Sequence, residues 1–446
     1  MEIPGAFRTE VVTCPVPPIM TPLPALTRVF PALLAAGIVL GSTAIPARAA
    51  DRAPVETGVV QYKVLLDTVT RGYDGQYCWV HPRAGIVPRG EHRSPAFVLT
   101  MQKLWLKGSD VFFALTETRT NDLGRTWLGP YEHTDTLGRR EEPGGVIVAA
   151  SDFWPKWHAK SGKLLGIGHT VRYTKNRVDG TLARQTVYSV YDPIQRTWTP
   201  WRTLDLPADD PASFNSGAGS VQRVDLPNGE ILLPVYGKRK GEADNRSRVL
   251  RCGFDGTTLT VIEQGAELAV KGGRGLVEPS LARFGGKFYL TLRNDTAGYV
   301  ATSSDGLNFD APRLWRWDDG TDLGNYNTQQ HWVTHRDGLF LVYTRRGASN
   351  DHVIRHRAPL FIGQIDPEKI VVRRATERIL VPDRGARLGN FGVTEVSPDE
   401  TWVTVAEWMQ TFSPQLIIPV DNPRGADNSV YAARIQWQKP NDFDFR

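Results

Sequence analysis

The chain has 446 residues, of which 41% are hydrophobic and 23% charged, so it holds enough apolar material for one large core or two ordinary ones. Its formal net charge is +5, but Lys and Arg are interspersed with nearly as many Asp and Glu, and no basic run dominates. Composition therefore excludes extensive disorder and argues against a nucleic-acid partner, whereas a small acidic substrate fits the charge.

Residues 1–50 carry a targeting signal. Arg28 precedes an apolar run over 29–40, and residues 47–49 (Ala-Arg-Ala) have the small residues that a signal peptidase requires. The run is too short for a transmembrane helix, and no later segment would span a bilayer. We predict a cleaved signal peptide and a secreted or periplasmic protein. Met20 could be the true start, which would make the N-terminus overlong.

Residues 51–446 are expected to form one domain built from a repeated unit. In each unit an extended segment leads to a turn rich in Gly or Asp and then to an apolar strand that ends in a polar residue. Six such strands occur, at residues 96–102, 163–169, 230–236, 287–293, 339–345 and 401–407. Their starts lie between 52 (339 − 287) and 67 (163 − 96) residues apart, which suits a four-stranded blade. The sequence thus predicts an all-β, six-bladed β-propeller of four-stranded antiparallel blades.

A propeller has to close its ring, and it commonly does so by pairing a strand from one end of the chain with a blade made at the other end. Residues 59–66 could supply the closing strand. We predict that they pair with residues 429–437.

The turn at residues 120–127 reads Thr-Asn-Asp-Leu-Gly-Arg-Thr-Trp. It resembles the Asp box, or BNR repeat, of sialidases (neuraminidases) and related propellers; a shortened copy stands at 303–309 and a weaker one at 191–198. We expect Asp122 and Asp305 to accept backbone N–H bonds across their turns, with glycine at positive φ and the aromatic residue packed between sheets. The motif indicates the fold and says little about chemistry.

The stretch 276–293 is similar to the part of sialidases that holds the glutamate activating the nucleophile and one of three arginines that clamp the substrate carboxylate. The matching residues are Glu278 and Arg293, which are 15 positions apart (293 − 278). The resemblance to the sialidase superfamily covers most of residues 75–410. It implies that the three arginines are Arg83, Arg293 and Arg345, with Arg346 or Arg355 as rivals of the last. Three guanidinium groups suit a carboxylated sugar, because each can bind a carboxylate through two hydrogen bonds.

The sequence departs from the sialidase pattern at the nucleophile. Sialidases attack with a tyrosine of the sixth blade, whereas the corresponding stretch here has Asn390. The acid/base aspartate should precede the first Asp box, where Asp110 is available, shifted by about two residues. Tyr236 could replace the nucleophile, with Glu278 of the neighbouring blade removing its proton; stacking against a sugar is the alternative role for this tyrosine.

Polar residues recur at equivalent strand ends, and in a propeller such positions converge on one pocket at the channel mouth. At the ends of the second strands stand Gln102, His169, Tyr236, Arg293, Arg345 and Glu407. At the start of the innermost strands stand His81, Glu278, Gln329 and Asn390, with Asp152 as a plausible member. We predict a function for the set, while any single member could be a rim residue facing solvent.

His81 and His331 could supply the missing proton transfers, since histidine titrates near neutral pH. Either could be a general base in hydrolysis or could abstract the proton beside a uronate carboxylate in β-elimination. His81, close to Arg83, resembles the layout of sialidase-like propellers that cleave rhamnose–glucuronate linkages.

The leading hypothesis is an exported, monomeric exo-glycoside hydrolase that acts on an acidic sugar of a glycan or polysaccharide. The expected catalytic residues are Glu278, His81, Tyr236, His331 and Asp110, and the expected substrate-binding residues are Arg83, Arg293, Arg345, His169, Gln329, Asn390 and Glu407. A polysaccharide lyase with His81 as base and Tyr236 as acid is the enzymatic alternative, and a non-catalytic carbohydrate-binding propeller is the other. No metal or cofactor motif is present, and Cys78 and Cys252 are interpreted as buried small residues.

Overall fold

The computed structural model describes residues 58–88, 94–207, 210, 214–411, 416–419 and 421–442. The predicted signal peptide lies outside these residues. Within them the regular secondary structure is almost entirely β-strand, with one short helix, α1 (Thr134–Leu137), and two described 3₁₀ turns, η3 (Ile354–His356) and η4 (Arg374–Thr376). None of the helices in the described part is long and apolar enough to cross a membrane.

The described strands form six antiparallel sheets. The first contains β2 (Tyr77–Val87), β3 (Ala96–Trp105), β4 (Phe112–Thr120) and β5 (Leu128–Glu132). The second contains β6 (Arg140–Glu142), β7 (Val146–His158), β8 (Lys163–Thr174), β9 (Arg177–Val178), β10 (Thr186–Asp192), β11 (Thr197–Trp198) and β12 (Arg202–Thr203). The third contains β13 (Ser216–Gly217), β14 (Val224–Asp225), β15 (Ile231–Gly237), β16 (Arg246–Phe254) and β17 (Leu259–Gln264).

The remaining three sheets follow in chain order. The fourth contains β18 (Val277–Phe284), β19 (Lys287–Arg293), β20 (Gly298–Ser303) and β21 (Arg313–Leu314). The fifth contains β22 (His331–His335), β23 (Gly338–Tyr343), β24 (Leu360–Asp366), β25 (Val371–Val372) and β26 (Arg378–Val381). The sixth contains β27 (Phe391–Ser397), β28 (Glu400–Ala406), β29 (Ser429–Trp437) and, from the start of the described chain, β1 (Tyr62–Arg71).

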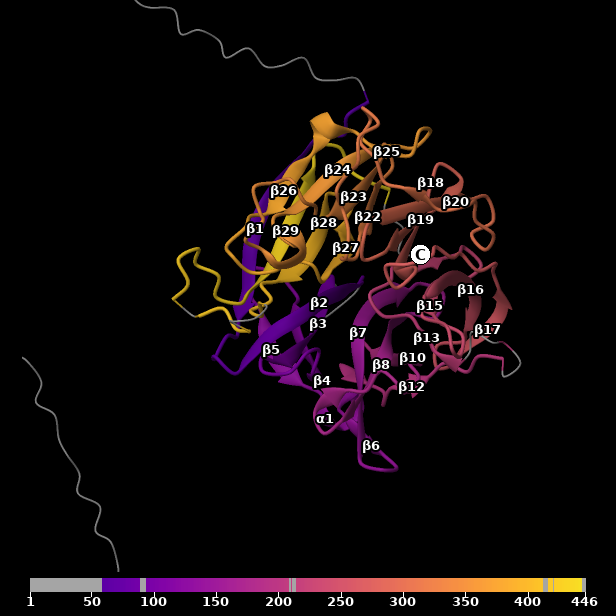
Figure 1. Cartoon of the computed structure of the whole chain (residues 1–446), viewed down its shortest axis with the longest axis vertical. Helices are drawn as coiled ribbons and strands as arrows, with labels where there is room; N and C mark the ends of the chain where they lie inside the picture. The colour runs from indigo at the N-terminus through magenta and orange to yellow at the C-terminus, as the bar shows by residue number, and fades with distance from the viewer. Residues whose placement is uncertain are drawn as a thin grey trace, which may run out of the picture. The chain divides into compact units, whose positions relative to one another are not determined.

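The sheets succeed one another around a common centre, with β2, β7, β22 and β27 on its side (Figure 1). Strand β2 contacts both β7 and β27, β8 contacts β13, and β18 contacts both β15 and β22, while β22 contacts β27. The arrangement is therefore the propeller-like one that the repeats predicted, and the six apolar repeat strands are the second strands β3, β8, β15, β19, β23 and β28.

The regularity of the blades is lower than predicted. The expected four strands per sheet are wrong for three sheets, which have seven, five and five strands. In the third sheet the inner strand is split into β13 and β14, each of two residues, so only five sheets have a continuous inner strand. Here Ser220 at φ 59° lies between the two pieces, which interrupts the ladder.

The sixth sheet joins the two ends of the described chain. Strand β1 pairs antiparallel with β29, with Leu66 opposite Ala433, and Tyr62 packs edge-on against Phe340 and Trp437. The predicted closing pair is confirmed, although β1 begins at Tyr62 and extends past the predicted end.

Local turn chemistry agrees with the sequence pattern. Asp122 accepts hydrogen bonds from the backbone N–H (2.9 Å) and the hydroxyl (2.7 Å) of Thr126, and Asp305 accepts two backbone N–H bonds in the corresponding turn. Gly306 adopts φ 79°, where a Cβ would lie 2.5 Å from the Leu232 side chain. Cys78 and Cys252 are free and fully buried, as interpreted from the sequence.

Candidate active site

Three inner strands, and the segment between β13 and β14 of the third sheet, share one local backbone distortion at a polar residue. His81, Asp152 and Glu278 have φ of 56°, 52° and 47°, and each sits in a β-bulge of its strand; Ser220 has the same backbone state in the third sheet. A bulge re-aims side chains relative to the regular alternation of a strand. Three of these four were predicted as strand-entry positions, and Ser220 was missed because its strand is interrupted.

Arg83 connects five sheets at the centre of the molecule. Its Nη2 donates to Asp152 Oδ1 (3.2 Å), Ser220 Oγ (2.7 Å) and Gln329 Oε1 (2.9 Å), and its Nε donates to the Phe391 carbonyl (3.3 Å). The side chain is 0% exposed. We call Arg83, Asp152, Ser220 and Gln329 the Arg83 network. Arg83 therefore lies at the floor of the site, and its buried Nη1 has no hydrogen-bond partner among the described residues, so its role as a substrate clamp stays a prediction.

His331 and Asn390 extend the Arg83 network. His331 Nε2 donates to Gln329 Oε1 (2.9 Å), and its Nδ1 lies 2.7 Å from Ser280 Oγ. Gln329 in turn donates to Asn390 Oδ1 (2.6 Å). Burial lowers the pKa of His331 well below its ordinary value. Because both ring nitrogens have partners within a fully buried environment, His331 supports the floor, and the structure gives no contact that favours its predicted catalytic role.

Asp152 stands between two histidines. His81 Nε2 lies 3.5 Å from Oδ1, and His169 Nε2 lies 3.6 Å from Oδ2. Burial lowers the pKa of His81, and burial together with Arg184 lowers that of His169 to about 3, so both rings are neutral at pH 7. Burial by itself favours the neutral acid at Asp152, but His81, Arg83, His169 and a hydrogen bond from Ser220 lower its pKa below the ordinary value.

Tyr236 adjoins this group through His169. Its hydroxyl lies 3.5 Å from His169 Nδ1, and the Arg184 guanidinium lies 4.5 Å from the centre of its ring. Burial raises the pKa of Tyr236, so the phenol is protonated at neutral pH. The hydroxyl's nearest base is thus His169 among the described contacts, whereas the sequence had suggested Glu278. A side chain at Gly219 would come within 1.9 Å of His169 Nδ1, so the glycine leaves room for the ring.

Glu278 and Arg293 meet as the sequence predicted. Arg293 Nη1 donates to Glu278 Oε1 at 2.6 Å, and Nη2 donates to Asn327 Oδ1 at 2.8 Å. Two buried atoms of this pair, Glu278 Oε2 and Arg293 Nε, have no hydrogen-bond partner among the described residues. The Glu278 side chain is 13% exposed, so the pair is nearly buried but still reaches solvent.

The positive charges of Arg293, Arg355 and Arg387 act on Arg357, and we call these four residues the arginine cluster. Burial lowers the pKa of Arg357 well below its ordinary value, and the positive charges of the other three lower it further. Burial lowers the pKa of Arg387 to about 10, which the negative charge of Asp110 opposes. The negative charge of Asp110 also acts to raise the pKa values of His81 and Arg355. Arg355 was a rival in the sequence interpretation, whereas Arg357 and Arg387 were missed because they lie outside the repeat strands.

Two predicted residues have other partners. Arg345 forms two hydrogen bonds with Glu377, at 2.8 and 2.7 Å, and its guanidinium faces the rings of Trp317 and Phe361. Glu407 accepts the backbone N–H of Ser429 at 3.2 Å and the Tyr431 hydroxyl at 3.1 Å, and burial raises its pKa. Both therefore have other structural partners, and none of the contacts among the described residues links either of them to the Arg83 network.

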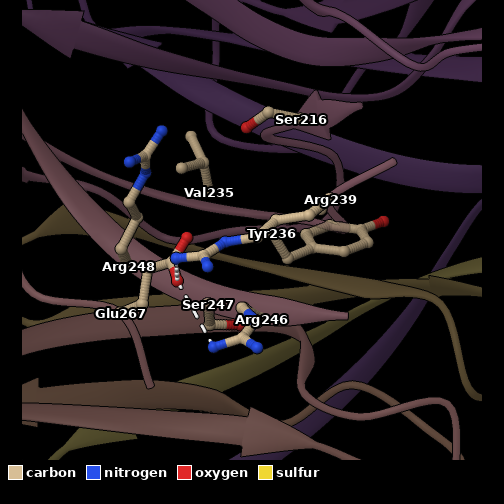
Figure 2. A pocket seen from close by; sticks show the side chains of 9 residues that line it. Ser216, Val235, Tyr236, Arg239, Arg246, Ser247, Arg248 and Glu267 are labelled. Carbon is tan, nitrogen blue, oxygen red and sulfur yellow. Dashed lines mark hydrogen bonds and ion pairs between the residues drawn. The ribbon is translucent and has the colours of Figure 1, made fainter. Parts of the chain in front are cut away.

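A small pocket lies beside β15 (Figure 2). Arg239 and Arg246 converge on Glu267, at 2.7 and 3.5 Å, while the ring of Tyr236 points away from these ion pairs. Arg246 also pairs with Glu242 at 3.0 Å, so these two arginines are balanced by two carboxylates, in contrast to the arginine cluster.

No family model matches the sequence, and no curated protein does. Among solved structures, a protein of unknown function from Dyadobacter fermentans is 15% identical with a TM-score of 0.54, over 84% of this chain and 99% of the other. The Trypanosoma rangeli sialidase is also 15% identical with a TM-score of 0.54; the match covers 80% of this chain and 55%, about half, of that enzyme. The NanB sialidase from Streptococcus pneumoniae is 10% identical with a TM-score of 0.55, over 83% and 70% of the two chains. The fold is thus similar to that of sialidase β-propellers, which supports the resemblance at the level of the fold.

Proposed function

We propose that this protein is an exported, sialidase-like exo-glycoside hydrolase that acts on a carboxylated sugar of a glycan or polysaccharide. The observation that carries the proposal is the arginine cluster beside Glu278. Arg274, which pairs with Asp295, adds a fifth arginine, against the three carboxylates of Glu278, Asp295 and Asp110. An excess of positive charge in a largely buried site favours a carboxylate ligand, because guanidinium groups stay charged and bind it in a fixed geometry.

The residues around the cluster can supply hydrolytic chemistry. The carboxylates of Glu278 and Asp110 both act to raise the pKa of His81. A pair of carboxylates is the usual equipment for breaking a glycosidic bond, one as acid and the other as base or nucleophile. Tyr236 is the alternative nucleophile, since Asn390, at the position where sialidases have tyrosine, is hydrogen-bonded to Gln329. We also take the six sheets as the blades of one propeller.

The test is a screen of sialate- and uronate-terminated oligosaccharides with detection of released sugar. Glu278→Gln should abolish release from the best substrate, whereas Glu400→Gln should retain it. The latter is a matched control because Glu400 forms a comparable ion pair with Arg434, at 2.8 Å, in the sixth sheet. Equal activity of both variants, or no turnover of any acidic glycan, would overturn the proposal.

β-Elimination on a uronate-containing glycan, such as a rhamnose–glucuronate polymer, is the second candidate. It is favoured by the neutral His81, whose Nδ1 is buried without a partner among the described residues, and by the protonated Tyr236. These groups could remove the C5 proton and protonate the leaving oxygen. Elimination creates an unsaturated uronate that absorbs ultraviolet light, which hydrolysis does not. Tight binding by calorimetry with neither product would indicate the non-catalytic alternative.

A further inference from the structure

The carboxylate of Asp152 has a different neighbour on each side. Oδ1 accepts hydrogen bonds from Arg83 Nη2 (3.2 Å) and Ser220 Oγ (2.5 Å) and lies 3.5 Å from His81 Nε2. Oδ2 lies 3.6 Å from His169 Nε2. Asp152 thus has contacts in the first, second and third sheets.

An ionised carboxylate can only accept hydrogen bonds. A neutral imidazole has one N–H, and its other nitrogen is an acceptor. The nitrogen that faces Asp152 is Nε2 in each ring, at 3.5 Å in His81 and 3.6 Å in His169, and a hydrogen there would be attracted by the carboxylate and would leave each Nδ1 with a lone pair. In His169 this Nδ1 atom is the one that lies 3.5 Å from the Tyr236 hydroxyl.

We propose that Asp152 is a positioning residue that holds His81 and His169 in the Nε2–H tautomer, so that His169 Nδ1 faces the Tyr236 hydroxyl as a hydrogen-bond acceptor. That hydrogen bond orients the Tyr236 hydroxyl, so His169, which the sequence indicated only as a binding residue, becomes a positioning residue for Tyr236. The role of Tyr236 in turnover rests on the proposed function, whereas the tautomers do not.

Several charged groups act on these two rings and determine whether each ring is protonated. The charges of Asp152, Asp110 and Glu278 act to raise the pKa of His81, and that of Arg83 acts to lower it. Arg184, His81 and Arg83 act to lower the pKa of His169, and Asp152 acts to raise it. The His169 ring also contacts the ring of Tyr236. Arg83 and Arg184 oppose protonation of His169, which agrees with a neutral ring beside the Asp152 carboxylate.

The tautomers can be measured directly without a substrate. Long-range proton–nitrogen NMR of protein labelled with ¹⁵N-histidine distinguishes the Nε2–H from the Nδ1–H form, and His81→Asn and His169→Asn assign the two signals. We expect both rings to be in the Nε2–H form at pH 7. An Nδ1–H form in either wild-type ring would overturn the proposal, whatever the variants do.

Asp152→Asn tests the cause, because an amide can donate to a ring nitrogen as well as accept from it. We expect the His81 and His169 signals to move toward the Nδ1–H form. Asp225→Asn is the matched control, since Asp225 forms a similarly buried pair with Arg223, at 2.9 Å. Unchanged tautomers in Asp152→Asn, or the same change in both variants, would contradict the proposal.

Kinetics supply the second readout on the substrate found in the screen. Asp152→Asn should reduce kcat by about 100-fold or more with little change in KM, as expected when a histidine loses its orienting carboxylate. A change confined to KM would assign Asp152 to substrate binding instead. If the screen finds no substrate, the proposed function fails while the NMR experiment still decides the positioning role.

Discussion

Glu278 Oε1 lies 2.6 Å from Arg293 Nη1, across the first two strands of the fourth sheet. The bulge between Val277 and Ser280 turns the glutamate toward the strand that carries the arginine. The pair is nearly buried, so each partner neutralises a charge that would otherwise be costly to bury. It also places a carboxylate next to the arginine cluster, where charge governs both stability and binding.

Arg293→Ala should lower kcat/KM for the acidic substrate by roughly thirty-fold to several thousand-fold, because about 2–5 kcal/mol of charge-assisted contact is lost. Arg345→Ala is the comparison, since Arg345 binds Glu377 and should leave kcat/KM within about threefold. Steady-state kinetics of both variants on the best substrate make the test. Equal losses in the two would remove the distinction that we draw between these arginines.

Folding must be separated from catalysis in that experiment. Arg293→Ala leaves the Glu278 charge nearly buried without its partner, so the unfolding free energy should fall by about 3 kcal/mol. The double variant Glu278→Gln/Arg293→Ala should regain part of this stability but none of the activity. Urea unfolding monitored by tryptophan fluorescence measures the first effect. If the double variant stayed as unstable as the single one, the stranded charge would not be the cause.

Arg83→Met should be among the most destabilising substitutions, with a loss of about 3–5 kcal/mol, because it removes the shared partner of Asp152, Ser220 and Gln329. Arg83→Lys should not restore the loss fully, since an ammonium group cannot reproduce the planar fork of the guanidinium. Differential scanning calorimetry of the three proteins gives the order of Tm. A Tm for Arg83→Met close to that of wild type would show that the floor does not depend on this cation.

Stability should fall as the pH drops below about 6.5, the ordinary pKa of histidine. Burial, with Arg184, lowers the pKa of His169 to about 3 in the folded state, so between these values the unfolded chain binds one more proton. The contribution of His169 is complete above the unfolded pKa and decreases by up to about 1.4 kcal/mol per pH unit below it. His169→Gln should therefore lose less stability than wild type between pH 7 and 5.5 in urea unfolding. Identical pH dependence in both would mean that His169 is protonated in the folded protein.

Tyr62→Ala should lower the unfolding free energy by about 3–5 kcal/mol, because the ring packs against Phe340 and Trp437 where β1 closes the sixth sheet. Tyr62→Phe should change it by less than about 1 kcal/mol, since the buried hydroxyl has no hydrogen-bond partner among the described residues. Thermal and urea unfolding compare the two. Similar, small effects of both substitutions would indicate that the N-terminal strand contributes little to closure.

Local pattern was sufficient for much of the fold. Recurring apolar runs that end in a polar residue identified the second strand of every sheet, and the Asp turns were recognisable because an aspartate at a fixed offset accepts the turn's own backbone N–H groups. The closing pair of β1 and β29 followed from the requirement that a propeller closes its ring with strands from both ends of the chain. The Glu278–Arg293 pair was also within reach, since both residues lie on adjacent strands joined by a tight turn and their meeting depends on register alone.

Which of the other charged groups come together was decided only by the tertiary structure. Arg345 occupies the strand end equivalent to Arg293, yet Glu377 lies within its reach, whereas Arg357 and Arg387 come to Arg293 from segments outside the repeat. Arg83 has partners up to 308 residues away, and no local rule specifies which of them will surround it. Strand periodicity tells which face a side chain takes, but the pairing of charges across sheets depends on how the whole ring closes, because burial and Coulomb interactions are properties of the assembled centre.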